Sequence, residues 1–340
     1  SPSHYLLTSQ ADIARIITDQ TSGTTAAAKR VFYTEDDILS TVNFFAAGIS
    51  EMVHPGETVL ITMPFSGALG LGDLIKKAVE KIGALPLCAG WGKTYAELSD
   101  LVLLHKPRCY IGFPVPLLSL ARYMGSAFSV ERALISGDVC SHGVFAALSE
   151  QFALYPHYGS REMCLGGAIT CDAQAGHAGS AFVGMHMREN HFIAEIIDED
   201  GRLLPDGQEG ELVITTIGMT AMPLIRYRTG DRTRIVPHSN CPCQSVTKRI
   251  AQPFRMGEAA DLLCALDDAI FALPEVIDYR AERRGEIVYL HALCKKDCVA
   301  AIRHRAQTVF PNIKVSGVLC QGHYRALYSG KRKLISEEVV

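Results

Sequence analysis

The residues best suited to chemistry begin with a run of hydroxyl-bearing side chains that surrounds a glycine and ends in a lysine. The run reads Thr-Ser-Gly-Thr-Thr-Ala-Ala-Ala-Lys and ends at Lys29. Backbone amides and hydroxyls in such a loop can donate to phosphate oxygens, while the lysine neutralises their charge. We therefore expect a loop that wraps a polyphosphate, although an ordinary polar turn can have the same composition. The residues assigned to this role are Thr21, Ser22, Gly23, Thr24, Thr25 and Lys29.

Two later strings add aromatic, acidic and cationic groups of the kind that nucleotides bind. The string Tyr-Gly-Ser-Arg-Glu, from Tyr158 to Glu162, supplies a ring that can stack on adenine and a carboxylate that can hold Mg²⁺ against phosphates. The string Ser-Gly-Lys-Arg-Lys sets Lys331 directly behind a flexible glycine. A mobile cation of this kind can neutralise charge that builds up only in a transition state. A solvated basic segment is the alternative for this string.

Composition and charge narrow the class of protein. The chain has 340 residues, with 33 basic and 36 acidic side chains and a net charge of −3, and its length suits about two domains. This balance argues against nucleic-acid or membrane-surface partners held by bulk electrostatics, and no apolar stretch reaches the ~18 residues of a membrane span. The first residues lack the charged and apolar regions of a secretory signal. Eleven scattered cysteines fit free thiols in a reducing cytoplasm better than a disulfide framework.

Strand-like and helix-like segments alternate over the first half of the chain. Strands are expected at 58–63, 84–88, 109–112 and 133–136, and helices at 34–49 and 71–82. Thr34 is a candidate N-cap for the first helix. Such alternation predicts a mostly parallel sheet with helices on its faces.

The second half changes first to β structure and then to a small mixed unit. Strands are expected at 191–197, 211–216 and 231–236, then at 277–283, 287–293 and 312–319, with helices at 261–273 and 297–309. We predict the α/β fold class, with a core domain over residues 1–252 that contains a β-rich subdomain at about 180–250. Residues 253–340 would form a small α+β domain.

Two neighbouring strings in the second half resemble motifs of a known family. Gly-Glu-Leu-Val-Ile-Thr-Thr begins at Gly210, and Pro-Leu-Ile-Arg-Tyr-Arg-Thr-Gly-Asp ends at Asp231. In this order they resemble the AMP-forming adenylating enzymes, in the phenylacetate–CoA ligase-like branch. An ion pair between Arg226 and Asp231 beside a turn is the plain alternative. The hydroxyl-rich run and the strings at Tyr158 and Lys331 resemble the family's phosphate loop, Tyr-Gly-x-x-Glu element and final Ser-Gly-Lys element.

The resemblance, which extends in patches from about Asp19 to Lys331, implies a role for each motif. Tyr158 would stack on adenine, Asp231 would accept hydrogen bonds from the ribose hydroxyls, and Glu162 would hold Mg²⁺. Lys331 would bridge the substrate carboxylate and the α-phosphate, with Lys333 in reserve. Ser136-Gly137-Asp138 occupies the place of the family's adenine-wall turn, although a plain strand-end turn fits as well. Besides the phosphate loop, the predicted nucleotide-binding residues are Gly137, Asp138, Tyr158, Gly159, Asp231 and Arg249.

A cysteine pair after Asp231 resembles a metal-binding feature of the same branch. Relatives often have Cys-x-Cys here, and some bind a structural zinc, so Cys241 and Cys243 are candidate ligands. The resemblance implies Cys171 and His186 as the other two ligands, which would complete the closed set of a structural zinc site. His177 and Cys164 compete for these two places. Free thiols packed as small hydrophobic groups are the alternative.

Three departures from the family pattern affect what we expect. The phosphate loop starts at Thr21, whereas relatives carry a larger segment before it, so a wall of the core is expected to be open or covered by a partner subunit, as in a homodimer. Ala26 and Ala28 replace a glycine and a proline of the loop and stiffen it. The family's Gly-Arg-x-Asp-Asp hinge is absent, and either Arg249 or Arg255 would replace its arginine. In the family this hinge makes the C-terminal domain mobile between the two half-reactions.

The motifs together predict an ATP-dependent, AMP-forming enzyme in which Lys331, Glu162 and Lys29 are catalytic. It would activate a carboxylic acid, aromatic by resemblance, to an acyl-adenylate and pass the acyl group to coenzyme A. ATP, Mg²⁺, coenzyme A and a structural Zn²⁺ are the expected cofactors. The alternatives are transfer to an amine, a carrier protein or an enzyme thiol, and a catalytically weakened relative that only binds nucleotide or acyl ligand.

Overall fold

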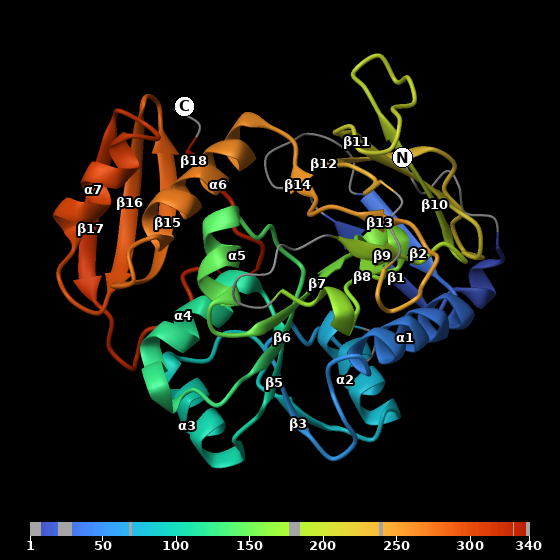
Figure 1. The fold of residues 1–340 in the computed structure, drawn as a ribbon, viewed down its shortest axis with the longest axis horizontal. Helices are drawn as coiled ribbons and strands as arrows, with labels where there is room; N and C mark the ends of the chain where they lie inside the picture. The colour runs from blue at the N-terminus through green and yellow to red at the C-terminus, as the bar shows by residue number, and fades with distance from the viewer. Residues whose placement is uncertain are drawn as a thin grey trace.

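A central eight-stranded sheet positions the candidate site (Figure 1). The computed structural model describes residues 8–19, 29–67, 70–176, 184–237, 241–328 and 330–337. The sheet has the strand order β13-β9-β8-β7-β6-β5-β3-β4. Its strands are β3 (Thr58–Ile61), β4 (Leu85–Cys88), β5 (Cys109–Gly112), β6 (Arg132–Ile135), β7 (Ala153–Tyr158), β8 (Ala168–Ile169), β9 (Met185–Met187) and β13 (Arg249–Ile250).

The two halves of this sheet differ in strand direction. From β4 to β7 the strands are parallel, and each follows a helix or is followed by one. Beyond β7 the strands β8, β9 and β13 pair antiparallel. The parallel half confirms the prediction from strand–helix alternation, because parallel neighbours need a crossover connection.

Five helices cover the two faces of the parallel strands. They are α1 (Glu35–Ile49), α2 (Leu71–Lys81), α3 (Tyr95–His105), α4 (Pro114–Met124) and α5 (His142–Ser149). Helices α1 and α2 pack on one face with Val59 and Ile61, while α3, α4 and α5 pack on the other with Leu60. Thr34 caps α1 in a capping box with Asp37, which confirms the predicted helix start.

A second, four-stranded antiparallel sheet forms the β-rich part of the core. Its order is β10-β11-β12-β14, from the strands β10 (Phe192–Ile197), β11 (Gly210–Thr216), β12 (Tyr227–Thr233) and β14 (Phe254–Arg255). We expected a strand at 231–236, but β12 begins four residues earlier at Tyr227, so Asp231 lies inside the strand. Because β14 pairs with β12, the core sheet continues past residue 252. A separate two-stranded hairpin of β1 (Arg15–Asp19) and β2 (Lys29–Tyr33) packs beside α1.

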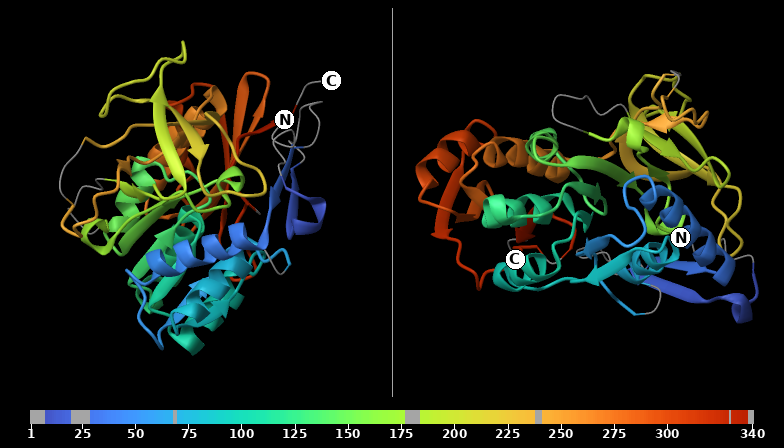
Figure 2. Two further views of the ribbon diagram at one scale, coloured as in Figure 1. Left: turned by 90° about the vertical axis from the view of Figure 1, so that its right-hand side faces the viewer. Right: turned by 60° about the horizontal axis from the view of Figure 1, so that its bottom comes forward.

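The C-terminal part is a four-stranded sheet with two helices. The sheet has the order β17-β16-β15-β18, from β15 (Val276–Arg284), β16 (Ile287–Cys294), β17 (Ile313–Leu319) and β18 (Ile335–Glu337), and its helices are α6 (Glu258–Phe271) and α7 (Val299–Gln307). This sheet and the β10–β11–β12 sheet lie at opposite ends of the molecule (Figures 1 and 2). Apolar side chains of α6 and β15 join those of α4 and α5 in one buried cluster.

No helix in the described part of the chain has both the length and the apolar character to cross a membrane.

Candidate active site and metal centre

Two predicted nucleotide-binding elements lie at the same edge of the central sheet. Tyr158 ends β7, and Gly137 and Asp138 follow β6, its parallel neighbour. Carboxyl ends of parallel strands share one edge, which is where open α/β sheets bind ligands. Gly137 has φ +81°, and a Cβ there would come within 2.7 Å of the Phe113 ring. The turn after β6 therefore requires glycine.

Asp231 reaches this edge from β12 and contacts Tyr158. The Tyr158 hydroxyl donates to Asp231 Oδ2 at 2.8 Å, and Arg255 Nη1 donates to Oδ1 at 3.3 Å. Burial, followed by the charge of Asp231, raises the pKa of Tyr158 well above its ordinary value, so this hydroxyl keeps its proton. The side chain of Asp231 is 16% exposed, which leaves its carboxylate available to accept further hydrogen bonds. Tyr158 and Asp231, far apart in the sequence, thus form one unit.

Glu162 lies beside them in a short turn that follows Gly159. Tyr227 of β12 donates its hydroxyl to Glu162 Oε1 at 3.1 Å. A Cβ on Gly159 would come within 2.1 Å of the Leu165 carbonyl oxygen, so the return of the chain here requires glycine. The carboxylate of Glu162 is of the type that holds Mg²⁺, with oxygen ligands supplied by side chains and phosphates.

The hairpin that flanks the predicted phosphate loop is attached to this turn. In the backbone of the hairpin, Asp19 pairs with Lys29, which brings the two ends of the intervening segment together. Tyr33 of β2 donates its hydroxyl to the Arg161 carbonyl, next to Glu162. The loop residues Thr21, Ser22, Gly23, Thr24 and Thr25 lie outside the described residues. Their roles, and that of the Lys29 side chain, stay predictions.

The loop that carries Lys331 lies against Asp138. Asp138 Oδ2 accepts a hydrogen bond from the backbone N–H of Arg332 at 2.7 Å, and its Oδ1 accepts one from Val139 at 2.9 Å. Lys331 is exposed. Burial raises the pKa of Asp138 to about 6, against the lowering effects of Arg332 and Lys331. The predicted C-terminal cation thus lies at the sheet edge that also holds Tyr158.

The two candidate hinge arginines lie in different places. Arg249 lies in β13, where its backbone pairs with that of His186. Arg255 lies in β14 and donates to the Thr229 carbonyl at 2.8 Å as well as to Asp231. The geometry favours Arg255 at the nucleotide site, although Arg249 was the residue assigned from the sequence.

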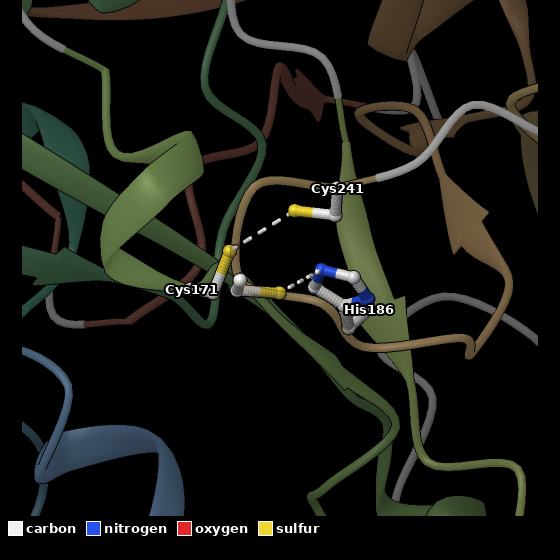
Figure 3. Close-up of side chains that lie close together, drawn as sticks. Cys171, His186 and Cys241 are labelled. Carbon is white, nitrogen blue, oxygen red and sulfur yellow. Dashed lines mark hydrogen bonds between the residues drawn. The ribbon is translucent and has the colours of Figure 1, made fainter.

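The four predicted zinc ligands come together in space. Cys171, His186, Cys241 and Cys243 each offer one ligand atom, and these atoms all lie within 4.8 Å of one another. Cys171 Sγ is 3.6 Å from Cys241 Sγ, and Cys243 Sγ is 3.4 Å from His186 Nε2 (Figure 3). Metal–ligand distances of about 2.3 Å for sulfur and about 2.0 Å for nitrogen give tetrahedral edges of about 3.8 Å and about 3.5 Å. These two distances lie close to the edges of a tetrahedral zinc site.

The surroundings of this cluster also suit a metal. His186 Nδ1 lies 3.0 Å from Thr247 Oγ1, which would orient the ring with Nε2 toward a metal. Burial, followed by the charge of Arg249, lowers the pKa of His186 and keeps the imidazole neutral, as a ligand must be. A tight turn, in which Gln244 N donates to the Cys241 carbonyl at 2.8 Å, holds the two thiols of the Cys-x-Cys pair together.

The structure places one of the two competing candidate ligands, Cys164, and does not describe the other, His177. Cys164 directly follows the turn that carries Glu162, and its thiol lies against α1, 3.5 Å from the Asp37 carbonyl oxygen, so it is not part of the cluster. His177 lies outside the described residues.

Three groups near these sites had no role assigned from the sequence. Tyr227 lies within the motif that ends at Asp231, so a role for its hydroxyl was within reach. Thr247 follows the cysteine pair closely, but its contact depends on how the chain returns to β9. Arg332 is buried although it lies between two lysines, and nothing in the sequence of this basic string indicates that.

The comparisons with known proteins agree with this geometry. Residues 8–222 match the model of the AMP-binding enzyme family, and the chain belongs to that family. Within it, the relatives place the chain in the phenylacetate–CoA ligase-like branch. The phenylacetate–coenzyme A ligase of Aromatoleum evansii is 30% identical over 232 residues, which cover 64% of this chain and 50% of the relative. That of Thermus thermophilus is 26% identical over 290 residues, covering 79% and 62%. The chain thus spans between half and about three fifths of these relatives.

Solved structures show the same fold. A 2-hydroxyisobutyryl-CoA ligase in its postadenylation state superposes with a TM-score of 0.76 at 20% identity, covering 98% of this chain and 75% of that one. A benzoate CoA ligase from Burkholderia xenovorans LB400 gives 0.59 at 13% identity, covering 92% and 66%. The predicted architecture, a large α/β core with a β-rich part and a small α+β unit, is confirmed.

Proposed function

We propose that this protein activates a carboxylic acid with ATP and then transfers the acyl group to coenzyme A. One observation carries the proposal: Tyr158 with Glu162, Asp231 and the Lys331 loop, from three separate parts of the chain, meet at one edge of the central sheet. The named relatives are phenylacetate–coenzyme A ligases, which supports an aromatic acid as the substrate.

In the first half-reaction, a carboxylate oxygen of the acid attacks the α-phosphorus of ATP in line. The bond from that phosphorus to the bridging oxygen breaks, and pyrophosphate leaves. Tyr158 would stack on adenine, Asp231 would accept hydrogen bonds from the ribose, and Lys331 would neutralise charge between the carboxylate and the α-phosphate. Glu162 would hold Mg²⁺, which neutralises phosphate charge when bound.

In the second half-reaction, the thiol of coenzyme A attacks the acyl carbon of the adenylate. The bond between the acyl carbon and the AMP oxygen breaks, AMP leaves, and the thiol proton passes to solvent. Support for this acceptor comes from the coenzyme A ligases among the relatives and the structural neighbours.

Further features of the proposal concern the metal, the compartment and the partners. A Zn²⁺ bound by Cys171, His186, Cys241 and Cys243 would hold the loop after β12 against β9. All eleven cysteines lie in the described part of the chain and none of them is paired in a disulfide there, which supports a reducing compartment such as the cytoplasm. A homodimer and a carrier-protein acceptor stay predictions, for which sedimentation and acyl-transfer assays provide the tests.

The test is acid-dependent exchange of labelled pyrophosphate into ATP over a panel of aromatic and aliphatic acids. We expect exchange with at least one acid, and a thioester detectable by mass spectrometry once coenzyme A is added. Exchange without a thioester would assign another acceptor. Nucleotide binding without exchange for any acid would overturn the enzymatic proposal and leave a binding protein.

A further inference from the structure

The residue that follows Lys331 is held from two sides. On the core side, both carboxylate oxygens of Asp138 accept backbone N–H groups, Oδ1 from Val139 and Oδ2 from Arg332. Both oxygens are therefore engaged in fixing backbone, at the turn where we expected Asp138 to help form an adenine wall. A half-buried carboxylate that accepts charge-assisted hydrogen bonds from two amides holds those amides firmly.

On the C-terminal side, the Arg332 side chain is locked into the small domain. It is 4% exposed, and its guanidinium pairs with Asp267 at 2.7 Å and Asp278 at 3.2 Å. It also lies over the rings of Tyr279 and Tyr328, with distances of 4.7 Å and 5.0 Å from Cζ to the ring centroids. A guanidinium suits such a site because its planar fork serves two acceptors and stacks on rings at once.

The carboxylates around Arg332 are themselves fixed. Tyr279 donates its hydroxyl to Asp267 at 2.6 Å, and the Leu327 amide donates to Asp278 Oδ2 at 2.9 Å. The Arg332 side chain therefore cannot turn away without stranding two buried charges, which is costly.

Lys331 lies between these constraints with its own side chain exposed. Burial alternates along this segment, with Lys331 and Lys333 exposed and Arg332 and Leu334 buried. Alternation sends neighbouring side chains to opposite sides of an extended segment. When Arg332 points into the small domain, Lys331 therefore points out of it, beside the sheet edge that carries Asp138 and Tyr158.

We propose that Asp138 and Arg332 are positioning residues that hold Lys331 at the nucleotide site for the adenylation step. This inference rests on the proposed function for the role of Lys331. Asp138 supplies the anchor from the core, and Arg332 supplies the anchor from the C-terminal domain. The two anchors meet at the Arg332 backbone amide, one bond away from the residue that they position.

A matched pair of substitutions tests this assignment. Asp268 offers the control, because its Oδ1 accepts the Gly143 amide at 2.7 Å across the same interface, away from Lys331. Asp138→Ala and Asp268→Ala each remove one carboxylate that accepts a backbone hydrogen bond across the interface between the core and the C-terminal domain. Pyrophosphate exchange measures the first half-reaction, and synthetic acyl-adenylate with coenzyme A measures the second one separately.

We expect Asp138→Ala to lower the kcat of exchange by roughly 10- to 100-fold, with the KM for ATP within about threefold, because orientation and not binding is lost. The second half-reaction should stay within about threefold. Asp268→Ala should change both by less than about threefold. Arg332→Lys, which keeps the charge but not the fork, should lose less exchange than Arg332→Ala. Equal exchange in folded Asp138→Ala and Asp268→Ala would overturn the assignment.

Hydrogen–deuterium exchange gives a readout that needs no activity. The Arg332 amide should exchange slowly in the wild type and at least about tenfold faster in Asp138→Ala, or in Asp138→Asn if the alanine variant does not fold. Equal protection in wild type and variant would refute the anchor. A wild type that shows this protection but no pyrophosphate exchange would refute the proposed function and retain the anchor.

Discussion

The Cys/His cluster and the nucleotide site differ in how the chain builds them. The four candidate zinc ligands lie in one part of the core, around β9 and the loop after β12, and their ligand atoms all lie within 4.8 Å of one another. The nucleotide site instead takes Tyr158 from the central sheet, Asp231 from the β-rich sheet and Lys331 from the C-terminal part. A site within one part of the fold can be rigid, whereas a site shared among three parts depends on how they dock.

Removing the C-terminal cation should have the largest effect on chemistry. Lys331→Ala is expected to lower pyrophosphate exchange by about 10²- to 10³-fold, because the loss of one preorganised charge costs about that much. ATP binding, measured by calorimetry, should remain, since Tyr158 and Asp231 are untouched. Lys333→Ala is the matched control and should lose much less. Equal losses of exchange in Lys331→Ala and Lys333→Ala would contradict the proposed role of Lys331 as the catalytic cation.

Removing a cluster cysteine should affect stability instead. Purified wild type is expected to contain about one zinc per chain by metal analysis, and Cys241→Ser should lose it, because a closed site needs all four ligands. The melting temperature should fall by on the order of 10 °C. Cys88→Ser, at an exposed cysteine outside the cluster, should keep both the metal and the stability. Zinc-free wild type of undiminished stability would refute the metal centre.

Substitutions of the two candidate hinge arginines should have the smallest effects, and each should affect a different site: the nucleotide site or the Cys/His cluster. Arg255→Ala removes an exposed ion pair to Asp231, so the KM for ATP should rise by only about two- to fivefold. Arg249→Ala, beside His186, should instead lower the melting temperature and weaken zinc retention. Steady-state kinetics gives the KM for ATP of both variants, and thermal melts give their melting temperatures. A larger KM change in Arg249→Ala would return the hinge role to that residue.

Much of the fold could be predicted because local signals agreed with the tertiary structure. The strand at Cys109–Gly112 has the predicted bounds, and the helix capped by Thr34 starts where expected. The short strands β8, β13 and β14 were missed, since two residues carry no periodicity. The strand at Asp231 was predicted to begin too late, because the polar residues of the family motif hid its start at Tyr227.

The candidate sites were predictable to different degrees for a physical reason. Tyr158, Glu162 and the cysteine pair belong to short motifs, in which neighbouring residues carry the signal. The buried state of Arg332 depends on Asp267 and Asp278, which are more than fifty residues away in the chain. Long-range pairing of that kind leaves no local pattern, so the sequence suggested only a basic string.

The apolar cluster that α6 and β15 share with α4 and α5 has a consequence for the working cycle. If the C-terminal domain turns between the two half-reactions, as the resemblance to the family implies, water must first enter this apolar contact. Hydrating apolar surface raises the heat capacity, so the enthalpy of the turn would itself change with temperature. The balance between the two domain orientations would then follow a curved van't Hoff plot, with warming and cooling acting unequally on the two chemical steps.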